Sequence, residues 1–233
     1  MKTVALIVSA GRGVRIPGER KKQFLLLGGR PILCHTLDPF EACPSIASIS
    51  LIVGAEDQDY CHQEIVRPHG YRKVSQILPG GPFRQDSVRN GIDALPGDVE
   101  MVVIHDGVRP FVTQKLIETS IQAARKYKAV VTAVPVKETI KMGGPDRTVL
   151  KTLDRESLWQ IQTPQTFQAG VIRDAFRKAE EDHFVGTDDA SLVERIGIKV
   201  YILDGSYSNI KVTTPEDLIL AGLILEREKP LKR

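Results

Sequence analysis

The sequence predicts an α/β fold, with a mostly parallel sheet flanked by helices in a single domain over residues 1–233. Three observations predict it. Short apolar runs rich in β-branched residues recur along the chain. Most of them are followed by a polar turn and then by an amphipathic stretch, which is the order of a parallel sheet with right-handed crossovers. Two extended runs interrupt that order once, so we also expect an inserted β-hairpin arm.

The first part of the chain alternates expected strands and helices. Each strand is a short apolar run that ends at a glycine or a polar turn. Pro31 suits the first turn of a helix, and the acids after Gly54 suit the positive end of the next one. The expected strands are residues 4–8, 46–53, 74–78, 101–104 and 129–134, and the expected helices are about 31–42, 56–66, from the 79–87 turn to about 95, and 115–126.

Residues 136–156 are expected to form the arm. The runs 136–142 and 148–153 flank the sequence Gly-Gly-Pro-Asp, which is a hairpin turn signal. A two-stranded ribbon is marginal alone in water, so this one needs a surface to pack on, and a second subunit is a natural candidate. After the arm we expect helices at about 168–182 and 188–196, a strand at 199–203, and a last helix from its N-cap Thr214 to about 228.

The composition is that of an ordinary globular protein. The 233 residues are 42% hydrophobic and 26% charged, with a formal net charge of +3, which gives no case for nucleic acid as the main partner. No apolar run approaches the roughly 18 residues that suggest a membrane span. Cys34, Cys43 and Cys61 follow no metal-binding spacing, and because the expected first strand begins at residue 4 we expect no cleavable leader. We therefore expect reduced thiols and a cytoplasmic location.

The turn after the first strand has the features of a phosphate site. Residues 9–13 read Ser-Ala-Gly-Arg-Gly, and glycine lets a bulky anion approach the backbone N–H groups. Ile16 stands where a dinucleotide fingerprint needs its third glycine, and the GK[ST] triplet of a P-loop is missing. The turn alone is common in α/β proteins, and charge runs are usually solvated. Its place at a strand end favours phosphate binding, as do the cations that follow it, Arg15, Arg20, Lys21 and Lys22.

Four polar segments fall where predicted strands end: residues 9–13, 80–87, 105–109 and 208–211. If the strands are parallel, the four segments converge on one edge of the sheet. Many cations and backbone amides without a clear nucleophile are typical of phosphoryl or nucleotidyl transfer, where Mg²⁺ is carried largely by the phosphates. Plain structural interpretations remain open for several residues: a surface ion pair or cap for Asp106 and Arg109, a core histidine for His105, and helix caps for Asp188 and Asp189.

Nine segments together match one known family. They are SAGRGVR (9–15), KKQF (21–24), GGRPILCHTL (28–37), GGPFRQDSV (80–88), HDGVRP (105–110), PVKETIK (135–141), DRESLWQIQTPQTF (154–167), GTDDAS (186–191) and NIKVTTPEDL (209–218). In these the chain resembles the 2-C-methyl-D-erythritol 4-phosphate cytidylyltransferases over nearly its whole length. The resemblance implies a Rossmann-like domain in which CTP and methylerythritol phosphate give a CDP-alcohol and pyrophosphate, with Mg²⁺ or another divalent cation. It also implies a homodimer in which each arm lends residues to the neighbour's site.

The resemblance implies a role for each matching position. The candidate catalytic residues are Arg15 and Lys22, which would grip the triphosphate and stabilise the pentacoordinate α-phosphate, and Lys211, which would hold the attacking phosphate. Asp106 is also a candidate metal ligand, with the CTP phosphates holding most of the metal. The candidate CTP-binding residues are Ser9, Ala10, Gly11, Gly13, Gly81, Pro82, Ser87, Asp106 and Gly107. The candidate contacts to the second substrate are Asp106, Arg109, Thr139, Arg155, Thr163, Thr187 and Lys211, with Thr139 and Arg155 supplied by the partner's arm.

The chain departs from the family pattern at four positions. Ser9 and Gly107 stand where alanine is usual, Val108 replaces a second alanine, and Lys21 stands where proline is usual. We expect Lys21 to add positive potential, and the bulk of Val108 to bear on which alcohol is used.

Other functions remain open from the sequence. A cytidylyltransferase for another polyol phosphate, such as ribitol 5-phosphate, would share the CTP half of the site. A nucleotide-binding protein without catalysis is a second alternative, although the intact charged residues Arg15, Lys22, Asp106 and Lys211 argue against it. An oxidoreductase is weaker, because the third glycine of its fingerprint is missing.

Overall fold

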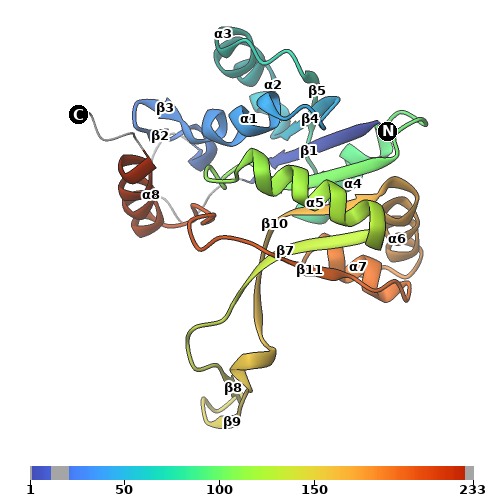
Figure 1. Ribbon diagram of the computed structural model, residues 1–233, viewed down its shortest axis with the longest axis vertical. Coiled ribbons are helices and arrows are strands. Elements are labelled where there is room, and N and C mark those ends of the chain that lie inside the picture. The colour runs from blue at the N-terminus through green and yellow to red at the C-terminus, as the bar shows by residue number, and fades with distance from the viewer. Residues whose placement is uncertain (1, 12–20, 229–233) are drawn as a thin grey trace.

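The computed structural model describes residues 2–11 and 21–228, and it confirms the α/β fold (Figure 1). Its centre is a seven-stranded sheet in the order β11-β7-β10-β6-β1-β4-β5. Neighbouring strands are parallel except at β10, which is antiparallel to both β6 and β7. The strands are β1 (Thr3–Ser9), β4 (Ser48–Val53), β5 (Val74–Pro79), β6 (Met101–Asp106), β7 (Ala129–Pro135), β10 (Trp159–Gln168) and β11 (Tyr201–Asp204).

Helices cover both faces of the sheet (Figure 1). Side chains of β1 alternate between two cores, with Leu6 facing one and Ile7 the other. This burial on both faces explains why the strands read as continuous apolar runs. The Ile7 face packs against α1 (Ile32–Ala42), α5 (Gln114–Tyr127) and a segment that holds α2 (Gln58–Tyr60), a π-helical stretch (Cys61–Val66) and α3 (Arg67–His69). The Leu6 face packs against α4 (Arg84–Asp93), α6 (Ala169–Glu181) and α7 (Asp189–Arg195).

The C-terminal helix α8 (Pro215–Glu228) packs on a short hairpin made of β2 (Leu26–Leu27) and β3 (Arg30–Pro31). At the turn of this hairpin Gly28 has a φ of +58°, and a Cβ there would lie 2.5 Å from Cδ2 of Leu225. Glycine is therefore required both for the backbone and for the close approach of α8. In the same small core, the N–H of Val212 donates to the carbonyl of Val108 at 2.9 Å. This bond places residue 211 beside the carboxyl end of β6.

Most expected helices and strands are confirmed, with shifts at their ends. The segment expected as one helix at 56–66 is instead a 3-10 turn (Ala55–Asp57), the short helix α2 and a π-helical stretch, and β10 was not predicted. It lies in the middle of the sheet between β6 and β7, yet it contains Pro164. Proline cannot donate a hydrogen bond to a neighbouring strand and is confined to edges and irregularities. The pairing of β10 with β7 is interrupted between Ile161 and Gln165, which spans this proline.

The predicted arm projects from the sheet between β7 and β10 (Figure 1). Its strands β8 (Lys141–Gly143) and β9 (Val149–Thr152) pair antiparallel and are shorter than the extended runs in the sequence. At its base Trp159 pairs with Pro135. A hairpin with so few paired residues gains little stability from its own hydrogen bonds.

The chain order creates a crevice between β1 and β6. The chain passes from β1 to β4 and β5 on one side of the sheet and returns to β6 on the other. Such a reversal separates the loops at the carboxyl ends of the two central strands, where open α/β sheets bind ligands. Strand β1 ends at Ser9 and β6 ends at Asp106, so two of the predicted site segments border this crevice. Among the described residues, no helix combines the length and the hydrophobicity that a transmembrane span requires.

Candidate functional site

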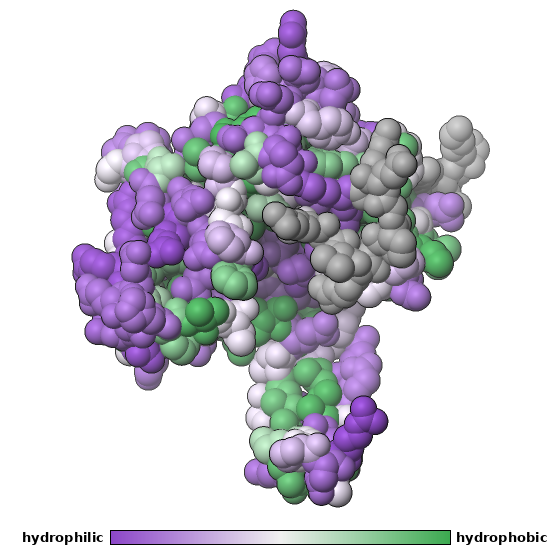
Figure 2. Space-filling model, turned by 180° about the vertical axis from the view of Figure 1, so that it is seen from behind, coloured by the Kyte–Doolittle hydropathy of each residue, from purple (hydrophilic) through white to green (hydrophobic). Residues whose placement is uncertain are grey.

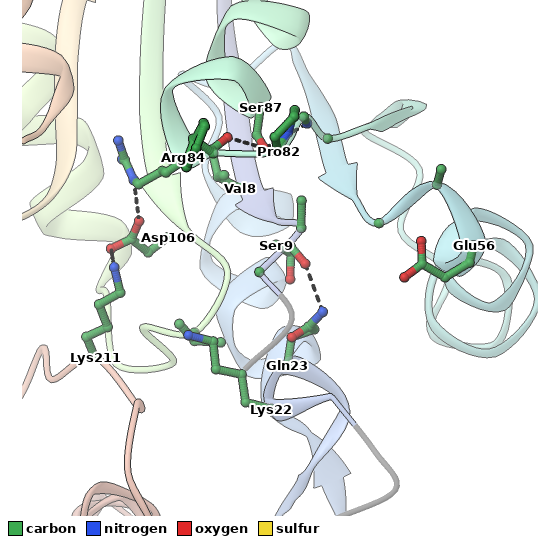
Figure 3. A pocket seen from close by; sticks show the side chains of 18 residues that line it. Val8, Ser9, Lys22, Gln23, Glu56, Pro82, Arg84, Ser87, Asp106 and Lys211 are labelled. Atoms are coloured by element: carbon green, nitrogen blue, oxygen red, sulfur yellow. Dashed lines mark hydrogen bonds and ion pairs between the residues drawn. The ribbon is translucent and has the colours of Figure 1, made fainter. Parts of the chain in front are cut away.

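A cleft of about 700 Å³ opens at the carboxyl ends of β1 and β6 (Figure 3). Its volume is within the range that holds a nucleotide-sized ligand. Gly13 and Arg15 lie outside the described residues. The predicted site residues that line the cleft are Ser9, Ala10, Gly11, Lys22, Gly81, Pro82, Ser87, Asp106 and Lys211.

The residue after Lys22 is hydrogen-bonded to the end of β1. Buried Gln23 donates from Nε2 to the backbone carbonyl of Ser9 at 2.9 Å. The N–H of Phe24 donates to the carbonyl of Lys21, which closes a short 3-10 turn over residues 22–24. Lys22 begins this turn, and its side chain extends into the cleft (Figure 3). The end of β1 therefore fixes the backbone from which the Lys22 side chain enters the cleft.

Lys21 does not act as we expected from the sequence. Its Nζ pairs with Glu56 and lies 2.6 Å from Oδ2 of Asp57, so its charge is neutralised within the protein. Partial burial disfavours that charge, but the two carboxylates outweigh it and raise the pKa of Lys21. The Lys21 side chain therefore links the segment before Lys22 to the turn after β4, and it does not add positive potential to the cleft.

The turn between β5 and α4 is closed by Ser87. Its hydroxyl accepts a hydrogen bond from the N–H of Gly81 and donates one to the carbonyl of Phe83, each at 3.1 Å. A hydroxyl has one donor and two acceptor lone pairs, so one lone pair remains for an amino group of a ligand. A Cβ on Gly80 would overlap the Cβ of Ala10, so only glycine lets this turn lie against the end of β1.

Asp106 lies at the centre of a cluster of charged side chains (Figure 3). Its Oδ2 is 2.9 Å from Nζ of Lys211 and 3.4 Å from Nε of Arg109, and its Oδ1 is 3.2 Å from Nε of Arg84. Burial alone raises the pKa of a carboxyl, but the three positive charges outweigh it and hold the pKa of Asp106 well below its usual range. Asp189 pairs with Arg84 as a second carboxylate. Three cations against two carboxylates leave the cluster positive, which favours an anion in the cleft.

His105 is a core histidine, as its structural interpretation predicts. Its Nδ1 lies 2.9 Å from the hydroxyl of Thr163, which also accepts a hydrogen bond from the N–H of Asp106, and its Nε2 lies 3.3 Å from the carbonyl of Arg109. These partners fit the tautomer with the proton on Nε2. The side chain is completely buried, and burial lowers the pKa of His105 to about 3. Neutral His105 and Thr163 together fix the end of β6.

We expect His105 to make the fold less stable as the pH falls from 6.5 toward 4. Histidine in an unfolded chain titrates near pH ~6.5, whereas the folded pKa of His105 is about 3. Between these values the unfolded state binds more protons than the folded state. The free energy of unfolding therefore decreases as the pH is lowered, by up to about 1.4 kcal/mol per pH unit. Denaturant unfolding of the wild type and His105→Asn between pH 7 and 4.5 measures this slope. The variant should show a shallower slope, and equal slopes would contradict the assignment.

Ser9 and Gly107, two of the departures from the family pattern, lie against each other. A Cβ on Gly107 would lie 2.7 Å from Oγ and 2.8 Å from Cβ of Ser9. The Ser9 hydroxyl is buried and has no hydrogen-bond partner among the described residues. Serine at position 9 therefore occupies space that a side chain at position 107 would need, and we interpret the two departures as a matched pair.

Gly107→Ala alone is expected to destabilise the fold by about 1–3 kcal/mol, because the added methyl overlaps Ser9. Ser9→Ala removes the nearer of the two overlapping atoms, so the double variant should regain about half of that loss or more. Ser9→Ala alone should cost little, because the hydroxyl that it removes has no partner. Denaturant unfolding of the four proteins measures the coupling. A double variant as unstable as the sum of the two single variants would disprove the pairing.

The predicted contacts to a second substrate are spread over three places. Asp106 and Lys211 line the cleft. Arg109 donates from Nη1 to the carbonyl of Asn209 at 2.8 Å, next to Asp106, and the Thr163 hydroxyl is used within the fold. Thr187 is exposed in the loop before α7. Thr139 and Arg155 are exposed on the arm, which projects from the sheet (Figure 1) and contributes no residue to the lining of the cleft in its own chain.

Two residues of the charged cluster escaped the sequence analysis. Arg84 lines the cleft, and its two terminal nitrogens donate to the two oxygens of Asp189 at 3.0 and 2.8 Å. Asp188 does cap α7, since it accepts a hydrogen bond from the N–H of Ser191 at 3.0 Å, but Asp189 faces the cluster instead. Arg84 and Asp189 are 105 positions apart, and no local spacing in the sequence indicates such a pair.

Within residues 2–11 and 21–228, no three His, Cys, Asp or Glu side chains are grouped as a metal site. Two carboxylates line the cleft, Glu56 and Asp106, and they come from opposite sides of it (Figure 3).

The sequence profile of one family, described as "IspD: 2-C-methyl-D-erythritol 4-phosphate cytidylyltransferase", matches residues 3–227. The 2-C-methyl-D-erythritol 4-phosphate cytidylyltransferase of Alkaliphilus metalliredigens (strain QYMF) is 43% identical over 228 residues, which cover 98% of this chain and 95% of the relative. That of Pelotomaculum thermopropionicum is 46% identical over 225 residues, covering 97% and 94%.

A solved structure agrees with these relatives. The 4-diphosphocytidyl-2C-methyl-D-erythritol synthase from Anaerococcus prevotii DSM 20548 matches the fold with a TM-score of 0.84 and 36% sequence identity. The match covers 97% of this chain and 96% of that one, so it extends over nearly the whole fold.

Proposed function

The chain belongs to the 2-C-methyl-D-erythritol 4-phosphate cytidylyltransferase family, and from this premise we propose how its cleft carries out the reaction. The enzyme joins CTP and 2-C-methyl-D-erythritol 4-phosphate to give 4-diphosphocytidyl-2-C-methyl-D-erythritol and pyrophosphate. The similarities favour this activity over the ribitol 5-phosphate alternative. The observation that carries the mechanism is the positive cluster around Asp106 at the carboxyl end of β6, in the same cleft as Lys22.

The proposed chemistry is an in-line displacement at phosphorus. A phosphate oxygen of the alcohol phosphate bonds to the α-phosphorus of CTP while the bond to the bridging oxygen of the pyrophosphate breaks. Lys22 and Arg15 stabilise the negative charge that builds on the α-phosphoryl oxygens. Lys211, held 2.9 Å from Asp106, holds the attacking phosphate. The protein needs no nucleophile of its own, because it positions two anionic reactants and offsets their charge.

The proposed nucleotide subsite combines backbone groups with one hydroxyl. Ala10 and Gly11 present backbone at the end of β1, and Gly81 and Pro82 present the turn after β5. The remaining lone pair of Ser87 can accept a hydrogen bond from the amino group of cytosine. Uracil has a carbonyl oxygen at that place and cannot donate, so this hydroxyl would favour CTP over UTP.

Mg²⁺ is proposed to enter with the nucleotide. Both oxygens of Asp106 already face cations, which leaves the carboxylate a poor metal ligand. This donor set fits a Mg²⁺ ion held mainly by triphosphate oxygens, with at most one or two carboxylates, as Mg²⁺ prefers at phosphate sites. When bound, the ion would offset charge on the phosphate oxygens.

The arm is proposed to complete the site of a second subunit in a homodimer. Met142, Val149 and Leu150 are 49%, 61% and 63% exposed on it, and Figure 2 shows the apolar surface that gathers there. A short hairpin with exposed apolar side chains gains stability when a partner covers it. The arm also carries Thr139 and Arg155, whose proposed contacts with the second substrate then lie in the partner's cleft.

The proposed location is the cytoplasm. Cys34, Cys43 and Cys61 are all free and buried, and burial raises the pKa of the Cys61 thiol to about 12. Unpaired, unreactive thiols are typical of a reducing compartment.

Subunit mixing tests the proposed roles and the shared site together. Lys22→Ala and Arg155→Ala homodimers should each release little pyrophosphate from CTP, Mg²⁺ and methylerythritol phosphate. After the two are mixed and allowed to exchange subunits, half of the dimers are mixed, and one of their two sites has both side chains intact. Activity should therefore recover to about a quarter of the wild-type value, as two-fold symmetry requires. No recovery in a mixture that has exchanged subunits would contradict the shared site.

A further inference from the structure

The first two side chains of α4, which directly follow the turn after β5, reach across to the loop before α7. The turn belongs to the proposed CTP subsite, and the loop carries Thr187 of the proposed second-substrate subsite. We propose that Arg84 and Gln85 are positioning residues that couple these two subsites, so that nucleotide bound at the turn orders the loop at residues 184–189. This inference rests on the proposed function for its assignment of the two subsites.

Arg84 holds both subsites with one guanidinium group. Its Nε donates to Oδ1 of Asp106 at 3.2 Å, while its terminal nitrogens grip Asp189 at 3.0 and 2.8 Å. Such a bidentate pair fixes distance and orientation together. The Asp189 side chain is 2% exposed, so water could not solvate its charge if Arg84 were removed. Movement of the turn must therefore move Asp189, the first residue of α7.

Gln85 makes a second, uncharged link between the same two segments. Its Nε2 donates to the carbonyl of Phe184 at 3.0 Å, and its Oε1 accepts a hydrogen bond from the N–H of Gly186 at 2.9 Å. The amide nitrogen and the amide oxygen of Gln85 therefore bind backbone groups on the two sides of Val185. The loop at 184–186 takes its position from the first turn of α4.

The far side of the loop is held by the sheet. Gln165 on β10 donates from Nε2 to Oδ2 of Asp188 at 2.8 Å and accepts from the N–H of Ala190 at 3.1 Å. The loop thus lies between a fixed strand and the ligand-binding turn, with side-chain hydrogen bonds to both. When the cytosine base of CTP binds at the turn, it restricts Arg84 and Gln85. Their hydrogen bonds to residues 184, 186 and 189 then restrict the backbone around Thr187.

Arg89 provides a matched control on the same helix. It pairs with Asp86 and Glu180, and its side chain is 31% exposed, close to the 29% of Arg84. It does not line the cleft, and among the described residues it makes no hydrogen bond or ion pair with residues 184–189, so Arg89→Met removes a similar ion pair without removing a link to the loop.

The test is hydrogen–deuterium exchange of the full chain with Mg²⁺, with and without CTP. In the wild type and in Arg89→Met, CTP should slow exchange at residues 184–189 about fivefold or more, in the usual range of coupling between sites. In Arg84→Met and Gln85→Ala the slowing should be lost. Gln85→Ala changes no buried charge, so it keeps the test decisive if Arg84→Met folds poorly. Equal slowing in Gln85→Ala and the wild type would overturn the coupling.

Kinetics give a second measurement on the same proteins. Gln85→Ala should raise the KM for methylerythritol phosphate about fivefold or more while the Kd of CTP, from calorimetry, stays within about twofold. A purely structural role would instead lower the unfolding midpoint and leave that KM unchanged. If the wild type binds CTP but uses no alcohol phosphate, the proposed function fails, whereas the exchange experiment still decides the coupling.

Discussion

Lys22→Ala is expected to lower kcat about 100-fold or more, the usual cost of removing one preorganised donor from a transition state. Lys22 begins a turn that buried Gln23 fastens to the end of β1, and its side chain enters the cleft. A charge already in position needs no reorganisation when negative charge builds on the α-phosphate. Arg15→Ala should have an effect of the same size, because the resemblance assigns it the same role. Initial rates of pyrophosphate release at saturating substrates measure both.

Lys21→Met is the matched control for this prediction. It removes the lysine that lies just before Lys22 and whose charge is paired with Glu56 and Asp57. Its loss should change kcat by less than about threefold, as partly exposed ion pairs contribute little. A Lys22→Ala enzyme that keeps a near-normal kcat would remove Lys22 from the reaction.

Asp106→Asn is expected to lower kcat/KM about 100-fold and stability by on the order of 3 kcal/mol. The amide keeps the shape of the side chain but loses the charge that three cations share. Lys211 loses the carboxylate that lies 2.9 Å from its Nζ. Arg84 and Arg109 then lie near Lys211 without the negative charge that offsets the three cations. Steady-state kinetics with each substrate varied, together with denaturant unfolding, separate the two effects.

Asp38→Asn is the control for the loss of a paired carboxylate. Asp38 binds Arg30 through both oxygens, at 2.8 and 3.1 Å, and accepts a hydrogen bond from Tyr71, but it does not line the cleft. Its variant should lose stability while the folded enzyme keeps both KM values. If Asp106→Asn behaved in the same way, Asp106 would be a structural residue and not part of the substrate site.

Much of the fold could be predicted because its strands are buried on both faces. Such strands are apolar runs that glycine turns end, as at Val53-Gly54, and both signals are local in the sequence. The convergence of Ser9, Ser87, Asp106 and Lys211 followed from a single rule, that parallel strands end at one edge. The arm could be predicted because its turn signal is also local.

The parts that were missed depend on contacts between distant residues. Strand β10 contains Pro164 and polar residues, and it becomes a central strand only because β6 and β7 lie on both sides of it. Arg84 and Asp189 are charged residues with no pattern around them, and only the fold brings them together. Lys21 was interpreted as free charge for the same reason, since its partners belong to the turn after β4.

The cleft at the carboxyl ends of β1 and β6 is expected to transfer the cytidylyl group of CTP to methylerythritol phosphate. The most direct measurement is pyrophosphate release from CTP and Mg²⁺, with methylerythritol phosphate and ribitol 5-phosphate assayed in parallel. We expect release with the first substrate and little with the second. Faster release with ribitol 5-phosphate, or no release with either from folded protein that binds CTP, would contradict it.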